Sequence, residues 1–309
     1  MVEIRDDRSR GPLTASEDGH EAGRVDRVTL DAKSGPPSAT LALLHTSSAH
    51  VPVFDALRVE EAPDLGLRHL VHPQLLDRAR ESGPDAVAGA VRDVLADAVA
   101  GGADAVLCTC STIGAVAETA SASLGVPVLR VDRPMAAAAV AHGGRIAVVA
   151  TVESTLEPTA ALIREEFAAR VEGASHEVGA ASGARGVRRR AGAGRDGDAH
   201  RAAIGVPPVA QRLGDHLTPH TPLAPHTPLA LHTVLARDAW PHFEAGDTDA
   251  YCAEIARTVD ALRDVDVVVL AQASMAPAVA RVTTRVPVLA SPRLGLRAAA
   301  AAAGPTRTG

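Results

Sequence analysis

The stretch DAVLCTCST, residues 104–112, has a near-copy in DVVVLAQAS, residues 266–274. Each begins with aspartate, continues through apolar residues typical of a buried strand, and ends in small polar residues ahead of a helical pattern. A second pair follows each copy, GVPVL at 125–129 and RVPVL at 285–289. A strand–helix–strand unit that recurs in the second half of a chain indicates duplication, and it predicts two pseudo-symmetric α/β lobes.

The chain between residues 41 and 303 alternates short apolar runs with helical patterns, which predicts parallel sheets covered by helices. We expect strands at 41–45, 105–108, 126–131, 145–151, 265–271 and 286–289. We expect helices at 73–100, 112–123, 134–142, 156–171, 247–264, 275–283 and 292–303. Ligands bind beyond the carboxyl ends of parallel strands, so two facing sheets predict an active-site cleft between the lobes.

Two segments break this alternation. Residues 1–38 are polar, charged and rich in Gly, Ser and Pro, which predicts a disordered tail. Residues 173–235 hold an Arg/Gly-rich run and the near-repeat LTPHTPLAPHTPLALHT, which predicts a flexible insertion rich in Gly, Arg, Pro and His. We therefore expect the first lobe over 39–142, and the second over 143–172 and 236–303, with helices free to cross between them.

Composition narrows the class of protein. The apolar fraction of the 309 residues is 46%, and the net charge of −6 argues against a nucleic-acid partner. No apolar run reaches the ~18–20 residues of a membrane span, and the N-terminus lacks an apolar signal core, which predicts a cytoplasmic protein. The three cysteines are too few for a disulfide framework, and the His-Thr-Pro repeats lack a Cys or carboxylate cluster to complete a metal site. We expect no metal.

Cys110 is the candidate reactive residue. Cys108 belongs to the expected strand and should be buried, whereas Cys110 lies in the turn before a helix. Free backbone N–H groups and the helix dipole stabilise a thiolate there, and the N–H groups of Ser111 and Thr112 would hold a carboxylate. The alternative is a small buried cysteine without chemistry. The repeat aligns three pairs of residues, Cys110 with Gln272, Ser111 with Ala273, and Thr112 with Ser274.

Four motifs, CTCSTIGAVAE, VPVLRVDRPMA, IAVVATVESTLEPT and DVVVLAQASMA, together resemble the aspartate/glutamate racemase superfamily. That superfamily includes hydantoin racemases, maleate isomerases and arylmalonate decarboxylases. The resemblance covers roughly residues 41–171 and 239–300. It implies two α/β lobes with the active site between them, and an isomerase of amino acid metabolism that needs no cofactor. It also implies a small amino acid or carboxylate substrate, and commonly a homodimer.

In that family two cysteines face each other across the α-carbon of the substrate. One removes the α-proton as a thiolate, and the other delivers a proton to the opposite face. The first family cysteine matches Cys110, but the second falls at Gln272, whose amide is neither acid nor base. His45 stands where the family has an acidic residue after its first strand. The resemblance thus implies catalytic positions at Cys110, His45 and Gln272. It implies substrate-binding positions at Thr46, Ser111, Thr112, Thr151, Ala273 and Ser274.

Three functions remain open from the sequence. The first is racemisation with His45 as the second base, because an ordinary histidine titrates in the right range. A strand-end histidine held by local hydrogen bonds is the alternative for that residue. The second is one-thiol chemistry, such as decarboxylation or isomerisation. The third is a carboxylate-binding protein without catalysis. Position 272 discriminates among them, because an acid or base beside it favours a two-base enzyme.

Overall fold

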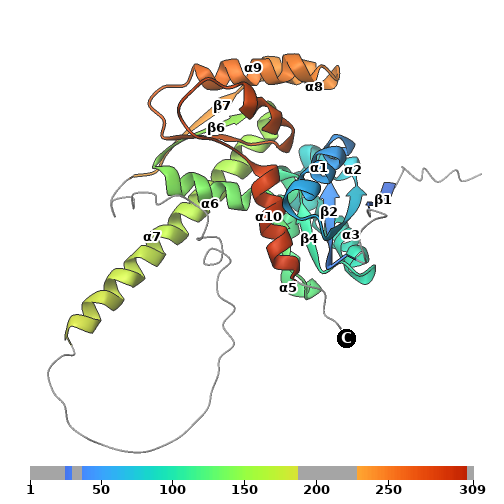
Figure 1. Cartoon of the computed structure of the whole chain (residues 1–309), viewed down its shortest axis with the longest axis horizontal. Helices are drawn as coiled ribbons and strands as arrows, with labels where there is room; N and C mark the ends of the chain where they lie inside the picture. The colour runs from blue at the N-terminus through green and yellow to red at the C-terminus, as the bar shows by residue number, and fades with distance from the viewer. Residues whose placement is uncertain (1–24, 30–36, 187–227, 305–309) are drawn as a thin grey trace, which may run out of the picture.

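The computed structural model describes residues 25–29, 37–186 and 228–304, and these form two α/β lobes (Figure 1). The first lobe holds a five-stranded sheet in the order β1-β3-β2-β4-β5, and the second a four-stranded sheet in the order β7-β6-β8-β9. All neighbouring strands run parallel except β1, which is antiparallel to β3. The predicted fold class is confirmed. None of the helices in the described part of the chain is both long enough and apolar enough to span a bilayer.

The elements of the first half of the chain alternate as expected. Its strands are β1 (Val25–Thr29), β2 (Ala39–His45), β3 (Leu65–Val71), β4 (Ala105–Cys108) and β5 (Val128–Arg130). Its helices are α1 (Val51–Glu61), α2 (Pro73–Ser82), α3 (Ala88–Ala100), α4 (Ser111–Thr119), α5 (Ser121–Leu124) and α6 (Arg133–His142). Strand β4 has the predicted bounds, while α1 and β3 add to the predicted set.

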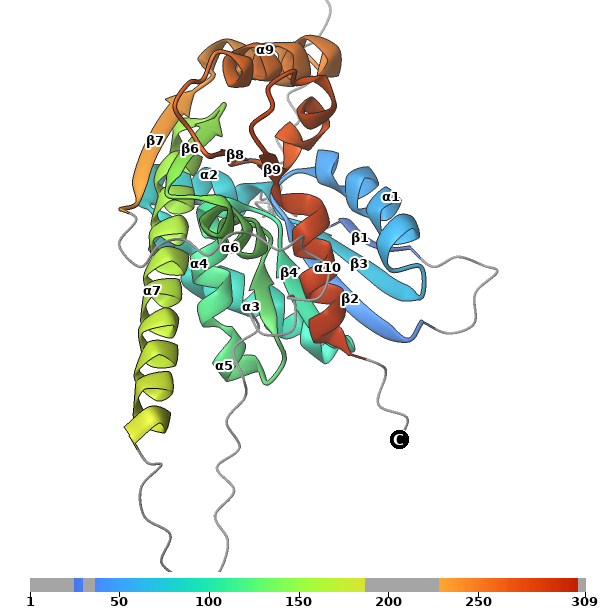
Figure 2. The same cartoon turned by 60° about the vertical axis from the view of Figure 1, so that its left-hand side comes forward.

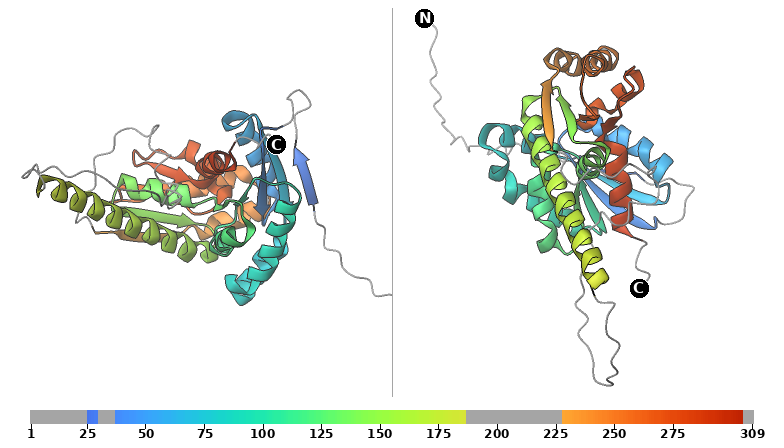
Figure 3. Two further views of the ribbon diagram at one scale, coloured as in Figure 1. Left: turned by 90° about the horizontal axis from the view of Figure 1, so that it is seen from below. Right: turned by 90° about the vertical axis from the view of Figure 1, so that its left-hand side faces the viewer.

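The second half repeats this arrangement. Its strands are β6 (Arg145–Ala150), β7 (Ala230–Leu235), β8 (Val267–Leu270) and β9 (Val288–Ala290). Its helices are α7 (Leu156–Gly186), α8 (Trp240–Glu244), α9 (Thr248–Asp260) and α10 (Ser291–Ala303), with a 3-10 helix at Ala273–Arg281. The long α7 stands away from the sheets at its C-terminal end (Figure 3). The predicted helix at 275–283 is a 3-10 helix that contains Pro277.

Two helices cross between the lobes, as the expected lobe limits allowed. Helix α6 follows β5, yet its Met135 packs in the apolar core around β6 and β8. Helix α10 follows β9, yet it lies against the first lobe (Figure 2), and its Leu296 belongs to the same buried apolar cluster as Leu41. Gly295 permits this close approach, because a Cβ atom there would lie 2.6 Å from the carbonyl oxygen of Val131. The exchange of helices ties the two lobes together.

Three predicted boundaries are wrong. Strand β1 lies inside the predicted tail, because VDRVT pairs with β3, from Val25 opposite Val71 to Thr29 opposite Leu67. The predicted insertion at 173–235 is too wide at both ends. The Ala-rich sequence continues α7 to Gly186, and ALHTVL forms β7, which pairs with β6. The remainder of both segments lies outside the described residues.

The expected helix over 73–100 is divided. It ends at Ser82, and a 3-10 turn, Pro84–Val87, precedes α3. Gly83 adopts φ 85°, and the ring of Pro84 disfavours a helical residue before it.

Candidate active site

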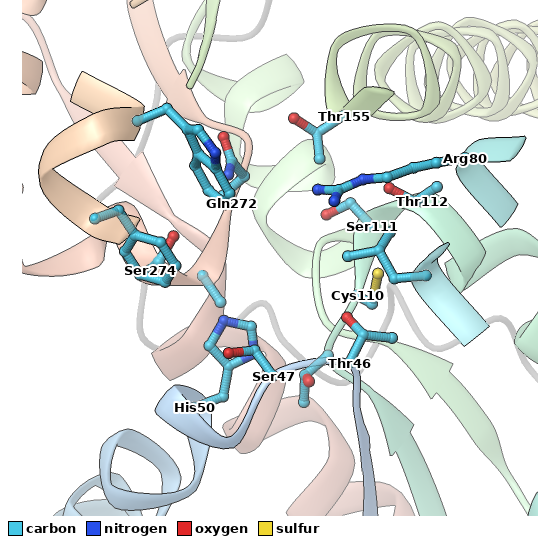
Figure 4. Close-up of a pocket in the computed structure, with 15 residues that line it drawn as sticks. Thr46, Ser47, His50, Arg80, Cys110, Ser111, Thr112, Thr155, Gln272 and Ser274 are labelled. Atoms are coloured by element: carbon cyan, nitrogen blue, oxygen red, sulfur yellow. The ribbon is translucent and has the colours of Figure 1, made fainter. Parts of the chain in front are cut away.

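The pocket lies between the lobes, where the carboxyl ends of β2 and β4 face those of β6 and β8 (Figure 4). Serine and threonine side chains line it together with the apolar side chains of Leu76, Trp240 and Phe243. The space within it and its mouth that protein atoms leave empty is about 510 Å³. Its lining residues are Thr46, Ser47, His50, Leu76, Arg80, Thr109, Cys110, Ser111, Thr112, Thr155, Trp240, Phe243, Gln272, Ala273 and Ser274. The predicted position of the cleft therefore agrees with the structure.

Cys110 is the cysteine that reaches this pocket. It is the extended residue immediately before α4, with φ −108° and ψ 116°, and it is 8% exposed. All three cysteines are free. Cys108 is fully buried in β4, and that burial raises the pKa of its thiol. Burial also raises the pKa of Cys252, which lies on α9 away from the pocket lining. Cys110 is therefore the cysteine that lines the pocket, whereas Cys108 and Cys252 are buried and the pKa values of their thiols are raised.

Gln272 occupies the matching place in the second lobe. It is the extended residue immediately before the 3-10 helix, with φ −122° and ψ 140°. Its side-chain oxygen accepts hydrogen bonds from the backbone N–H of Thr151 at 2.6 Å, the hydroxyl of Thr151 at 2.9 Å and the N–H of Val152 at 3.2 Å. Because those donors occupy Oε1, the Nε2 group is what the side chain offers to a ligand.

Ser274 lines the pocket, and no histidine or carboxylate in the described part of the chain hydrogen-bonds to its hydroxyl. Its hydroxyl lies 2.9 Å from the hydroxyl of Tyr251, and burial raises the pKa of that tyrosine. Tyr251 also lies 3.5 Å from Thr151 Oγ1. Thr151 itself is not among the lining residues, and its predicted role as a substrate contact stays a prediction. Thr151 holds the side chain of Gln272 through a hydrogen bond. Thr155, which follows the same strand, lines the pocket.

His45 is not among the residues that line the pocket, and its predicted role as a base stays a prediction. Its side chain is fully buried behind the wall, with Nδ1 2.8 Å from Thr109 Oγ1 and Nε2 2.8 Å from His69 Nδ1. Burial, and then the neighbouring His50 and His69, lowers the pKa of His45 well below its ordinary value. The chain continues from β2 through Thr46 and Ser47 into a 3-10 turn, and this path brings His50 to the pocket.

His50 is therefore the histidine of the site. Burial lowers its pKa to about 4, so its imidazole is neutral at pH 7. Its Nδ1 atom is buried and has no hydrogen-bond partner in the described part of the chain. Figure 4 shows its ring across the pocket from Thr112 and beside Ser47. No sequence signal distinguishes His50 from His45, because both flank the same strand end.

The two hydroxyl residues after Cys110 differ in what they do. Ser111 donates a hydrogen bond to the carbonyl oxygen of Ala271 at 3.1 Å, which links the ends of β4 and β8. The hydroxyl of Thr112 is buried at the pocket and has no partner among the described residues, so a ligand can satisfy it. Of the predicted substrate-binding residues, the pocket brings together Thr46, Ser111, Thr112, Ala273 and Ser274.

Arg80 is the residue that sequence reasoning missed most clearly. It comes from the last turn of α2, and its guanidinium group extends over the pocket beside Thr112 (Figure 4). It is the one charged side chain in the pocket lining, and it pairs with no carboxylate in the described part of the chain. Nothing in the sequence near Arg80 resembles a motif. The described residues contain no cluster of three or more His, Cys, Asp or Glu side chains that could hold a metal ion.

Comparisons with known proteins agree with this architecture. The Asp/Glu/hydantoin racemase family model matches residues 56–204. No curated protein matches the chain. A cysteine variant of arylmalonate decarboxylase in a sulfate-associated form is 17% identical, with a TM-score of 0.51 over 86% of this chain and 93% of that one. A racemase-like protein from Yersinia pestis is 13% identical, with a TM-score of 0.49 over 86% of this chain and 99% of that one.

A glutamate racemase from Bacillus anthracis is 14% identical, with a TM-score of 0.48 over 83% of this chain and 78% of that one. At such identities, likeness to a solved structure concerns the fold. The motifs CTCSTIGAVAE (108–118) and VPVLRVDRPMA (126–136), together with Cys110, fall within the matched range of 56–204.

Proposed function

Since residues 56–204 match the Asp/Glu/hydantoin racemase family model, we propose that the chain is an isomerase-type enzyme of that family and that Cys110 is its acid and base. The thiol acts at the carbon next to the carboxylate of a small amino acid or carboxylic acid, without a cofactor. The observation that carries the proposal is the position of Cys110, at the start of α4, inside a pocket between the lobes.

The substrate carboxylate binds against the start of α4. The first N–H groups of a helix lack intrahelical acceptors, and the helix dipole favours an anion at that end. Thr112 adds a buried hydroxyl that has no partner in the described protein, and Arg80 adds the positive charge of the pocket lining. Together these groups supply hydrogen-bond donors and a cation where a carboxylate needs both. Among the described residues no Asp or Glu lines the pocket, so no carboxylate in this lining repels the anion.

Loss of the α-proton moves negative charge onto the carboxylate oxygens, as in an enediolate. The same donors that bind the ground state then stabilise the greater charge, and fixed donors in a desolvated pocket do this well. The C–H bond breaks as the thiolate of Cys110 becomes a thiol, and the reverse transfer restores the C–H bond. Proton transfer by a positioned group contributes roughly 10²–10⁴-fold to the rate.

Gln272 limits this chemistry to one face of the substrate. It stands at the place equivalent to Cys110 in the other lobe, and its amide carries no proton to exchange near neutral pH. Its Nε2 group donates a hydrogen bond to the substrate instead. The favoured outcomes are exchange of the α-proton, decarboxylation or isomerisation, rather than racemisation by two thiols.

His50 supports a second candidate, racemisation by Cys110 and His50. Its neutral imidazole lines the pocket, and its Nδ1 atom has no partner in the described protein. This arrangement gives the predicted histidine base to His50 rather than to His45. The two candidates differ in the product, because two bases on opposite faces invert the α-carbon and a single thiol does not.

The test is exchange of the α-proton in D₂O, followed by ¹H NMR, with aspartate, glutamate, their close relatives and small dicarboxylic acids as substrates. Wild type should exchange at least one of them, Cys110→Ala should not, and Cys252→Ala should match wild type because Cys252 lies away from the lining. Chiral chromatography of the same samples, with His50→Gln as a further variant, separates the two candidates.

A third outcome marks a protein that binds without catalysis. In that case a carboxylate raises the melting temperature of wild type, but neither wild type nor any variant exchanges the α-proton. That result contradicts the enzymatic proposal. Stabilisation by ligand is expected under either function, since anything that binds the native state raises its stability.

A further inference from the structure

Aromatic side chains are scarce in this chain, and most of them gather beside the pocket. The 309 residues include one tryptophan, one tyrosine and three phenylalanines. The rings of Trp240 and Phe243 stack with centroids 5.0 Å apart and planes 26° from parallel, and the ring of Phe243 lies 5.2 Å from that of Tyr251. Trp240 and Phe243 also line the pocket. Three of the five aromatic side chains therefore form one cluster at the proposed active site.

This cluster is anchored in the second lobe, but the core does not cover its outer rings. Tyr251 is 1% exposed, and Phe243 packs against the apolar core that contains Tyr251. Trp240 is half-buried and belongs to none of the buried apolar clusters in the described part of the chain. Trp240 and Phe243 lie three residues apart on α8, so their rings project from one face of that helix. A fixed ring at a pocket wall gains free energy when an apolar group of a ligand covers it.

The first lobe adds an apolar residue and a cation to the same lining. Leu76 and Arg80 lie one turn apart on α2 and therefore project from one face of that helix. Both line the pocket, and Arg80 is the charged side chain of its lining in the described protein. His50 adds no charge at pH 7, because burial lowers its pKa to about 4. The lining thus offers positive charge for one carboxylate and an apolar wall for the rest of the ligand.

We propose that Trp240, Phe243 and Leu76 form a subsite for the side group of the substrate, and that this group is apolar and flat, such as an aromatic ring. The substrate is then a small acid with one carboxylate, which binds at the start of α4, and a ring that stacks on the aromatic wall. This inference rests on the proposed function, because the subsite belongs to the pocket of Cys110. It adds a ranking of substrates, in which an acid with a ring binds more tightly than a dicarboxylate of equal chain length.

A second carboxylate, as in aspartate or glutamate, fits this subsite poorly. It would leave water for an apolar wall, and the described lining holds no second cation to pair with it. A ring has no such cost, and stacking on Trp240 adds to the gain from burial. The pocket and its mouth leave about 510 Å³ empty, which is in the size range of sites for small ligands.

Trp240 is the single tryptophan of the chain, so tryptophan fluorescence reports on this subsite directly. The probes are 3-phenylpropionate and succinate, which carry a phenyl ring and a carboxylate, respectively, at the end of the same two-carbon chain. 3-Phenylpropionate should change the emission of Trp240 and bind at least tenfold more tightly than succinate, because burial of a ring face is worth about that factor. Isothermal titration calorimetry gives both dissociation constants independently of fluorescence.

Trp240→Leu, measured by calorimetry, should weaken binding of 3-phenylpropionate about fivefold and leave that of succinate within twofold, since leucine is apolar but cannot stack. If Trp240→Leu does not melt cooperatively, Phe243→Leu decides, with the same selective loss followed by Trp240 fluorescence. The matched control is Phe167→Leu, which changes a half-buried ring on α7 that is not among the lining residues. It should leave both affinities as in wild type.

Succinate binding as tightly as 3-phenylpropionate, or no detectable binding of 3-phenylpropionate, would overturn the subsite. An equal loss of both affinities in Trp240→Leu would do the same, because it would assign Trp240 a structural role. These equilibrium measurements need no turnover, so selective binding without exchange of any α-proton would count against the proposed function alone. Exchange with aspartate but not with phenylalanine, which has a ring in place of the second carboxylate, would count against the subsite alone.

Discussion

Thr151 fixes Gln272 from the end of the neighbouring strand: the side-chain oxygen of Gln272 lies 2.6 Å from the backbone nitrogen of Thr151 and 2.9 Å from its hydroxyl. The loop after β6 therefore orients the residue that follows β8. This contact holds the amide with its oxygen toward the protein and leaves its N–H groups for the pocket. The second half of the cleft is thus built to donate hydrogen bonds, whereas the first half carries the thiol.

Cys110 should be the cysteine that iodoacetamide labels first. It lines the pocket, while Cys108 and Cys252 are 0% and 1% exposed and burial raises the pKa of both. Near pH 7, peptide mass spectrometry should find labelling of Cys110 about tenfold faster than that of either other cysteine. Equal or preferential labelling of Cys252 would contradict the assignment.

Ser111→Ala should destabilise the protein through the junction of the lobes. The Ser111 hydroxyl donates to the buried carbonyl of Ala271, and its removal leaves that carbonyl without this donor. We expect the free energy of unfolding to fall by about 1–2 kcal/mol, measured by urea denaturation. Ser48→Ala is the matched control, because Ser48 is exposed. Indistinguishable stabilities of the two variants would show that the inter-lobe bond contributes nothing.

Arg80→Gln should weaken binding of a carboxylate substrate. Arg80 adds the positive charge of the pocket lining, and it acts on the ground state and the transition state alike. We expect KM to rise about tenfold with kcat nearly unchanged, the pattern of an interaction that binds both states equally. Arg92→Gln, an exposed change on α3, should leave KM as in wild type. A fall in kcat without a rise in KM would assign Arg80 to the chemical step instead.

Residues 190–225 should be replaceable by a Gly/Ser segment of equal length. Their composition is too polar and too rich in Gly, Pro and charge to bury a core, so the melting transition should stay cooperative and within about 2 °C of wild type. The same replacement of 230–235 should lower the melting temperature by several times as much, because it removes β7 from its pairing with β6. Equal effects would mean that the two segments contribute alike to the fold.

The duplicated stretch makes much of this fold predictable. Residues 105–108 and 267–270 are short apolar runs followed by small polar residues, and such local patterns determine where a buried strand ends and a helix begins. The match of Cys110 with Gln272 follows from that register and holds in the structure, where both precede a helix in extended conformation. The break at Gly83–Pro84, which the expected helix over 73–100 missed, also has a local signal, since proline disfavours a helical residue before it.

The rest of the site depends on long-range packing that no local pattern contains. His45 and His50 are near neighbours in sequence, but the turn into α1 brings one to the pocket and leaves the other behind its wall. Arg80 lies on α2, and no sequence pattern around it indicates that it shares a pocket with Cys110. The crossing of α6 and α10 between lobes is likewise decided by which apolar faces meet, and the sequence of either helix alone does not specify its partner.

The claim that a single thiol acts on one face of the substrate is tested most directly by Gln272→Cys, compared with wild type and Gln272→Ala. Each protein is incubated at length with single enantiomers of aspartate, glutamate and close relatives, and the products are separated by chiral chromatography. We predict that wild type exchanges the α-proton of one enantiomer without full inversion, and that Gln272→Cys creates or raises racemisation by placing a second thiol opposite Cys110. Efficient interconversion of both enantiomers by wild type, unharmed in Gln272→Ala, would contradict this account and would make His50 the second base.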